Sequence, residues 1–561
     1  MDINADSVPL DEFSAERSAT HIEAISRYPH PMGTVENEQV RDYIIAELSQ
    51  LNIPSEVQST RVPEFYRGIP NEFVNIYNVI AVLPGMNPTG AIALVGHYDT
   101  VPTSPGANDD GSAVATLLET ARSFQEGPPL QNDILLLFTD AEEPGQYRYG
   151  ARYFVNNYEN IHDIRLVLNF EALGRSGPSI MFETAPGNDW IIKGFSEGTS
   201  NPIAFSFMSD LYRMVAKGGT DFIAFEESGI NGMDFAYAFE RTIYHTALDN
   251  DNNLDNRSLQ HHGDYVTSLT RYFGNLNLTE LTSVNHDDYV FHSFFGNTLW
   301  HYPRSWAIPL IIITGIILAI LIFIGSKRRQ ISIGGITLSV CIFICELISI
   351  TIITTLAWWG IDSAHLALGI VVEPNIKSHL LLVAFLILSF LMIILSRKFI
   401  LKRVAPMDRN LGPMLFWWFI AILTGIYLPG FNIILIWPLI FSFIPVFLIL
   451  LKNTDEANSW RFTITSSICA IIVVVITIAP IYLLFQAMGV SSPGFSGSPS
   501  FPIIGLSIFF WIMLISLILP QFRIFGDVEN KRTILSIAVI ACIILIIGIL
   551  LPGIQLESFG L

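Results

Sequence analysis

The chain has 561 residues and a formal net charge of −19, but its charge is unevenly distributed. Residues 1–305 hold 41 acidic and 17 basic residues, a net charge of −24, whereas residues 306–561 hold 9 and 14, a net charge of +5. The first part mixes apolar and polar residues and is long enough to bury a large core, while the second part is mostly apolar. This division excludes one uniform soluble domain.

Residues 1–305 have the pattern of an α/β domain. The spacing of Val40, Ile44, Leu48 and Leu51 predicts an amphipathic helix. Three apolar runs, 91–96, 134–139 and 166–170, predict buried strands, and acidic or histidine residues follow each of them. Because an open α/β sheet carries its site at the carboxyl ends of its strands, we expect these polar residues to gather at that edge.

Five clusters of carboxylates and imidazoles follow one another between Gly96 and Asn250. They are His97-Tyr98-Asp99, Asn108-Asp109-Asp110-Gly111, Glu142-Glu143, Glu171 and Tyr244-His245-Thr246. Zinc takes imidazole nitrogen and carboxylate oxygen, and two zinc ions that share a carboxylate need about five ligands plus a free carboxylate as base. Each cluster alone also fits an ordinary role, such as helix capping by Asp109 and Asp110. Together they supply the residues of a two-zinc hydrolytic site.

Four segments resemble the zinc aminopeptidase Y family of exopeptidases; they read GHYDTVPTSPGANDDGSAVA, DAEEPG, NFEALG and YHTALDN. With the apolar second half, the chain is similar to the membrane branch of that family, which includes endoplasmic reticulum metallopeptidase and fungal vacuolar membrane protease. The resemblance covers about residues 14–273. It implies an α/β zinc-exopeptidase domain with a mixed central sheet flanked by helices, and two Zn²⁺ ions.

The resemblance also implies which residues bind these ions. One zinc would be held by His97 and Glu171, and the other by Glu143 and His245. Asp109 would bridge both ions.

The remaining two residues of the family pattern are Glu142, as general base, and Asp99, which would orient the imidazole of His97. The chain departs from the pattern at two points. Many soluble members have Asp where this chain has Glu171, and the run PGQYRYGARYF after Glu143 is longer than the usual turn, which predicts a reshaped pocket.

Residues 306–561 contain eight apolar runs of the length that spans a bilayer. The runs lie near residues 306–325, 333–356, 379–396, 414–429, 432–451, 462–485, 502–520 and 533–551. We expect an all-α polytopic transmembrane domain of eight helices over 306–561, joined by a linker, 281–305, to the peptidase domain, 1–280. Glu346, inside the second run, is an intramembrane acid that is either functional or paired near an interface.

Basic residues predict the orientation, because with the exception of Lys377 they occupy the loops after the first, third, fifth and seventh runs. These loops should be cytoplasmic, which places residues 1–305 outside the cytoplasm. Residues 1–51 contain no apolar export signal, so we expect a signal anchor ahead of residue 1 and nine spans in all. All four cysteines lie in the apolar runs, and an outer domain without disulfides favours a bacterial cell membrane over a eukaryotic endomembrane.

The ligand set and the resemblance together predict a membrane-anchored zinc metallopeptidase, specifically an aminopeptidase. Its expected partners are a peptide substrate and the lipid bilayer, and not nucleic acid. One alternative is a glutaminyl-cyclase-like acyltransferase with one zinc, against which the retention of both His97 and His245 argues. A second is a catalytically silent scaffold or transporter, which would have no need for the complete ligand set.

Overall fold

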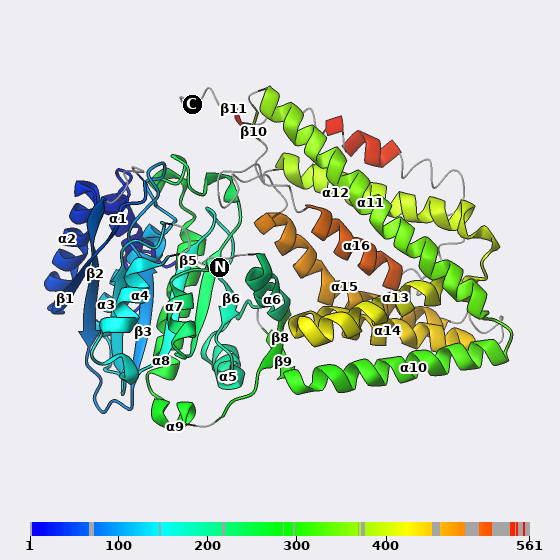
Figure 1. Ribbon diagram of the computed structural model, residues 1–561, viewed down its shortest axis with the longest axis horizontal. Helices are drawn as coiled ribbons and strands as arrows, with labels where there is room; N and C mark the ends of the chain where they lie inside the picture. The colour runs from blue at the N-terminus through cyan, green and yellow to red at the C-terminus, as the bar shows by residue number, and fades with distance from the viewer. Residues whose placement is uncertain are drawn as a thin grey trace. The chain divides into compact units, whose positions relative to one another are not determined.

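The computed structural model describes residues 3–66, 72–144, 147–215, 219–283, 285–294, 298–368, 370–371, 376–451, 460–488, 504–518, 539–544, 546–547 and 554–555. The chain divides into two compact units, Met1–Arg304 and Ser305–Leu561. The first unit is α/β and the second is almost entirely helical (Figure 1). The predicted fold class is therefore confirmed.

A mixed sheet of seven strands forms the centre of the first unit, in the order β1-β2-β4-β3-β5-β7-β6. Its strands are β1 (Ser55–Pro63), β2 (Phe73–Leu83), β3 (Ala91–His97), β4 (Asp133–Thr139), β5 (Ile164–Ala172), β6 (Ile180–Thr184) and β7 (Gly232–Tyr237). Strands β4, β3, β5 and β7 are parallel, β2 and β6 flank them antiparallel, and β1 pairs antiparallel with β2. The three predicted strands are β3, β4 and β5, in the middle of the sheet, where both faces are buried.

Helices cover both faces of this sheet (Figure 1). They are α1 (Ala15–Ile25), α2 (Val35–Gln50), α3 (Gly111–Glu126), α4 (Tyr149–Asn157), α5 (Asp189–Gly198), α6 (Ser206–Val215), α7 (Phe222–Glu227), α8 (Asn256–Phe273) and α9 (Leu278–Thr282). Successive residues of β3 face opposite sides, so Ile92 and Leu94 join the core that includes α3 and α8, whereas Ala93 and Val95 join the core that includes α4 and α7. The amphipathic helix predicted around Ile44 is α2, which confirms that expectation.

Much of the stretch predicted as a linker, 281–305, is folded instead. It contains β8 (Tyr289–Phe294) and β9 (Thr298–Pro303), which form an antiparallel hairpin. Phe291 and Leu299 of this hairpin are buried in the main core, and Ser293 donates a hydrogen bond to the carbonyl of Pro202. The first unit therefore extends to Arg304. His292 and Ser293 interrupt the apolar alternation of β8. They are buried only because β8 packs against the segment around Pro202, about ninety positions earlier in the chain.

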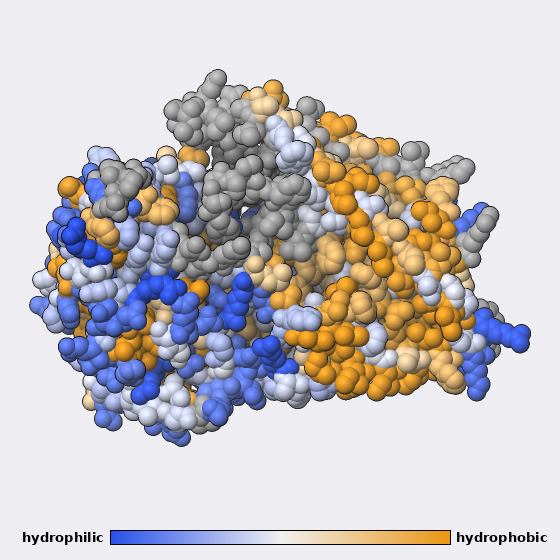
Figure 2. Space-filling model, in the orientation of Figure 1, coloured by the Kyte–Doolittle hydropathy of each residue, from blue (hydrophilic) through white to orange (hydrophobic). Residues whose placement is uncertain are grey.

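In the second unit, six helices of the described ranges are long and apolar enough to cross a membrane. They are α10 (Ala307–Lys327), α11 (Ile333–Ala367), α12 (Ile376–Phe399), α13 (Pro406–Tyr427), α14 (Asn432–Leu451) and α15 (Trp460–Met488). The exposed surface of this unit is largely hydrophobic, as expected of helices that face lipid (Figure 2).

The last two predicted runs are less completely described. The seventh corresponds to α16 (Ile504–Ile518), an apolar helix shorter than the other six. Most of the eighth, 533–551, lies outside the described residues. Two short strands, β10 (Ile370–Val371) and β11 (Ile554–Gln555), pair antiparallel.

Candidate metal centre

Three of the five predicted clusters lie at the carboxyl ends of neighbouring central strands. His97 is the last residue of β3, Glu142 and Glu143 follow β4, and Glu171 is the penultimate residue of β5. Because these strands are parallel and adjacent, their ends meet at one edge of the sheet.

Asp109, in the loop before α3, lies between two histidines. Its Oδ1 is 3.4 Å from Nε2 of His97, and its Oδ2 is 3.1 Å from Nε2 of His245. Oε2 of Glu171 lies 3.5 Å from the same nitrogen of His97, and Oε2 of Glu143 lies 3.1 Å from that of His245. The structure thus brings the five predicted ligands together in two groups that share one carboxylate.

The donor atoms of this centre fit a metal better than they fit one another. Oε1 of Glu143 is buried without a hydrogen-bond partner among the described residues, and Oδ2 of Asp109 and Nε2 of His245 face each other at 3.1 Å without the geometry of a hydrogen bond. Buried polar atoms without partners are costly, and a divalent cation would remove that cost. Imidazole nitrogen and carboxylate oxygen are the ligands that zinc takes, so the residues fit zinc.

Burial and close contact perturb the acids of the centre in opposite directions. Burial raises the pKa of Glu143 to about 7, although His245 opposes the shift. Burial would also raise the pKa of Asp109, but its contacts with the two histidines outweigh it and lower that pKa. In return, Glu143 and Asp109 overcome the burial of His245 and raise its pKa to about 10. A cation bound here would displace the histidine proton and stabilise the ionised carboxylates.

Asp109 and Asp110 are adjacent but act differently. Asp110 is the N-cap of α3: its Oδ1 accepts a hydrogen bond from the N–H of Ala113 (3.3 Å) and its Oδ2 accepts one from the N–H of His97 (3.3 Å). Helix capping, the alternative considered for both, therefore applies to Asp110. A side chain at Gly96 would place its Cβ 2.6 Å from that of Ala113, so glycine permits α3 to approach β3 here.

Asp99 contacts His97 mainly through its main chain rather than through its carboxylate. Its carbonyl oxygen is 3.0 Å from Nδ1 of His97, whereas its nearest carboxylate oxygen is 3.6 Å away. The carboxylate instead accepts hydrogen bonds from the N–H groups of Glu142 (2.9 Å) and Glu143 (3.2 Å). Asp99 thus holds the backbone of these two glutamates in place.

Arg148 holds Glu142, and sequence reasoning did not single it out. Its Nε lies 2.9 Å from Oε1 of Glu142, its Nη1 donates to the Glu142 carbonyl (2.7 Å), and its Nη2 donates to the carbonyl of Gly219. Burial raises the pKa of Glu142 well above its usual range, and Arg148 opposes that shift. The available signal was the unusual length of the run that contains Arg148.

Asp249 supports the other side of the centre, and it too was not assigned a role. Its carboxylate accepts hydrogen bonds from the N–H and the side-chain amide of Asn108 (both 2.8 Å) and from the N–H of Asp109 (3.2 Å). It therefore fixes the turn that presents the carboxylate of Asp109. Asp249 lies in the segment YHTALDN, four residues after His245, but an isolated aspartate there predicts nothing by itself.

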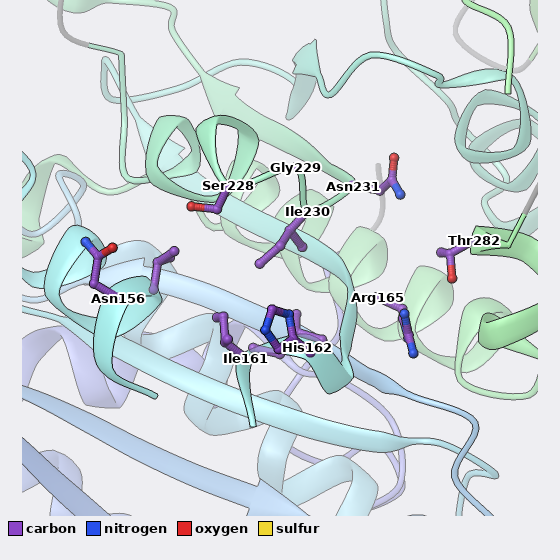
Figure 3. A pocket seen from close by; sticks show the side chains of 11 residues that line it. Asn156, Ile161, His162, Arg165, Ser228, Gly229, Ile230, Asn231 and Thr282 are labelled. Atoms are coloured by element: carbon purple, nitrogen blue, oxygen red, sulfur yellow. The ribbon is translucent and has the colours of Figure 1, made fainter. Parts of the chain in front are cut away.

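A separate cavity of about 300 Å³ lies at the opposite edge of the sheet (Figure 3). Ile161, His162, Arg165 and Ile230 are among its lining residues, at the amino ends of β5 and β7. It contains none of the predicted ligands, and the amino ends of parallel strands are not where sites of open α/β sheets form.

Residues 78–270 match peptidase family M28. The first unit is an M28 peptidase domain. The chain is 27% identical over 334 residues to endoplasmic reticulum metallopeptidase 1 of Mus musculus, a match that covers 56% of this chain and 37% of that protein. It is 28% identical over 325 residues to a vacuolar membrane protease of Candida dubliniensis, covering 56% and 34%. These findings confirm the predicted family branch.

The chain spans about a third of the length of these two relatives. The six apolar helices of the described residues, together with the match to a vacuolar membrane protease, support a multi-pass membrane protein with an M28 domain. Similar solved structures include an aminopeptidase from Aneurinibacillus sp. strain AM-1 (TM-score 0.39, 16% identity, 47% of this chain and 95% of that chain). Another is Porphyromonas gingivalis glutaminyl cyclase (TM-score 0.37, 21% identity, 48% and 99%).

Proposed function

We propose that this chain is a membrane-anchored metallopeptidase that uses two zinc ions and removes residues from the amino terminus of peptides. The observation that carries the proposal is the position of Asp109, whose two oxygens face two different histidines. His97 and Glu171 would hold one zinc, Glu143 and His245 the other, and Asp109 both.

Bound zinc would polarise the scissile carbonyl and acidify water at the site. Glu142 is the adjacent carboxylate not used as a ligand, and its Oε2 lies 4.0 Å from Nε2 of His97, at the border of the ligand group. It can take a proton from the attacking water as the C–O bond forms and deliver it to the leaving amine as the C–N bond breaks. Arg148 restrains its other oxygen, which keeps Glu142 pointed at the reaction site rather than free to bind metal.

The amino-terminal direction of attack rests on the resemblance of the motif segments to the zinc aminopeptidase Y family.

Tyr66 is the residue we expect to contact the substrate. Its ring packs with that of Tyr149 against a small core that contains Ala141, the residue before Glu142. Its Oη is buried without a hydrogen-bond partner among the described residues. The phenol is therefore a spare donor close to the proposed base, and a bound peptide offers it carbonyl acceptors.

The proposal is tested by incubating the purified full chain with zinc and a mixture of peptides, followed by mass spectrometry and zinc analysis. Stepwise loss of amino-terminal residues with two zincs per chain is expected. Loss from the carboxyl terminus would contradict the direction of attack. Cyclisation of amino-terminal glutamine with one zinc would favour the acyltransferase, and no reaction with any peptide would favour the scaffold.

The orientation is a further part of the proposal: the M28 domain faces away from the cytoplasm, in a bacterial cell membrane. Lys327 is the last residue of α10, and Arg397 and Lys398 lie in the last turn of α12. These basic residues adjoin alternate loops, and loops rich in Lys and Arg are retained in the cytoplasm. Protease added to intact cells of the organism that makes this protein should therefore degrade the M28 domain. Protection of the domain until the cells are lysed would refute the orientation.

A further inference from the structure

The second unit contains a cavity of about 550 Å³ between α11 and α12. This volume is within the range of pockets that hold small molecules. Cys341, Cys345 and Ser349 line it from α11, and their side chains are exposed at its mouth. Phe399, at the end of α12, is exposed on the other side of the mouth.

The floor of this cavity is polar. Glu346 is only 8% exposed, and its Oε1 accepts a hydrogen bond from the hydroxyl of Ser396 on α12. Both residues line the cavity. Glu346 lies inside an apolar helix long enough to cross a membrane, where a carboxylate is costly and therefore marks a functional site by default. The metal centre of the M28 domain makes no use of it.

We propose that this cavity binds a single-chain amphiphile whose head group is a protonated primary amine. The ammonium would lie against Glu346 on the floor, and the alkyl chain would lie along the apolar side chains of α11 and α12. The carboxylate selects a cation over a neutral or anionic head group, because an ion pair in a low-dielectric pocket is much stronger than in water.

Alkylation of the cysteines of this unit can report whether the cavity is occupied. Cys341 and Cys345 are exposed at its mouth, and Cys542 is exposed elsewhere in the same unit and does not line it. The full chain in detergent is treated with N-ethylmaleimide in the presence of dodecylamine, dodecanol or dodecanoate, and alkylation of each cysteine is followed by mass spectrometry. Cys542 corrects for any effect of the amphiphile on the micelle.

Dodecylamine should slow alkylation of Cys341 and Cys345 at least threefold relative to Cys542, whereas dodecanol and dodecanoate should have little effect. Equal protection by all three amphiphiles would show that the alkyl chain alone fills the cavity and would overturn the proposal. Absence of protection by dodecylamine would also overturn it.

Two variants sharpen the test. Glu346→Gln removes the charge but keeps the shape and an oxygen that can accept from Ser396, so it should lose the protection by dodecylamine. Ser389→Ala is the matched control, because Ser389 is on α12 but does not line the cavity, and its hydroxyl bonds to the carbonyl of Phe385 on its own helix. Protection that persists in Glu346→Gln would refute the role of the carboxylate. If that variant does not fold, the comparison of the three amphiphiles on the unaltered chain still decides the proposal.

Discussion

The Glu142→Gln substitution separates the chemistry of the metal centre from its metal content. Glutamine keeps the size of Glu142 and an oxygen that can still face the guanidinium of Arg148, but it cannot take a proton from water. Loss of a general base typically lowers the rate by ~10²- to 10⁴-fold, which corresponds to roughly 3–5 kcal/mol of transition-state stabilisation. We expect a loss of kcat in this range with both zinc ions retained.

The same substitution should leave the fold intact. Removing one charge of a buried ion pair costs about 3–5 kcal/mol when the other charge is left uncompensated. Here Arg148 keeps its bonds to the carbonyls of residue 142 and of Gly219, so the loss of stability should be smaller than that. The unfolding temperature of the variant measures this directly.

Glu143→Gln is the matched control, because it makes the same chemical change one position away. Oε2 of Glu143 lies 3.1 Å from Nε2 of His245, in the ligand group, so this variant should lose zinc as well as activity. Peptide hydrolysis and zinc per chain are measured for both variants under the same conditions. Activity near that of the unaltered chain in Glu142→Gln, or equal zinc loss in both variants, would refute the assigned roles.

Three further predictions concern the surroundings of the centre. Glu171→Ala should lose one of two zincs and most activity, while Glu171→Asp retains part of both; elemental analysis that finds two zincs in the Ala variant would remove Glu171 from the centre. Asp249→Asn should weaken zinc binding by ~10- to 100-fold, because it disturbs the hydrogen bond to Asp109, and competition with a chelator measures the change. Burial, aided by the neighbouring His262, lowers the pKa of His261 from 6.5 to about 3. The neutral imidazole therefore stabilises the fold fully above about pH 6.5, and this contribution falls as the pH drops from 6.5 towards 3. His261→Asn keeps an acceptor for the N–H of Ser179 and cannot be protonated, so its deficit in unfolding temperature should shrink between pH 7.5 and pH 5; a constant deficit would contradict the assigned pKa.

The amino-acid sequence predicted the elements whose signals are local. Strands β3, β4 and β5 are continuous apolar runs, and α2 buries Val40, Ile44 and Leu48 at helical spacing, so neighbouring residues alone specify these elements. The end of a buried strand is also a local feature, which is why the acids and histidines that follow these strands were recognisable as one candidate centre. The β8-β9 hairpin was missed because its pattern is irregular and its burial depends on distant residues.

Tertiary structure alone decided how the polar residues of the centre divide their roles. Asp109 and Asp110 have nearly the same local sequence environment, yet Asp110 caps α3 and Asp109 faces two histidines. Asp249, 140 positions away from Asp109, fixes the turn that contains it. In the same way, Arg148 becomes the partner of Glu142 only because the folded domain brings its Nε to 2.9 Å from Oε1 of Glu142. The nearby sequence specifies the type of a side chain and its position at the end of a strand. The direction in which that side chain points is set by hydrogen bonds and packing across the folded domain.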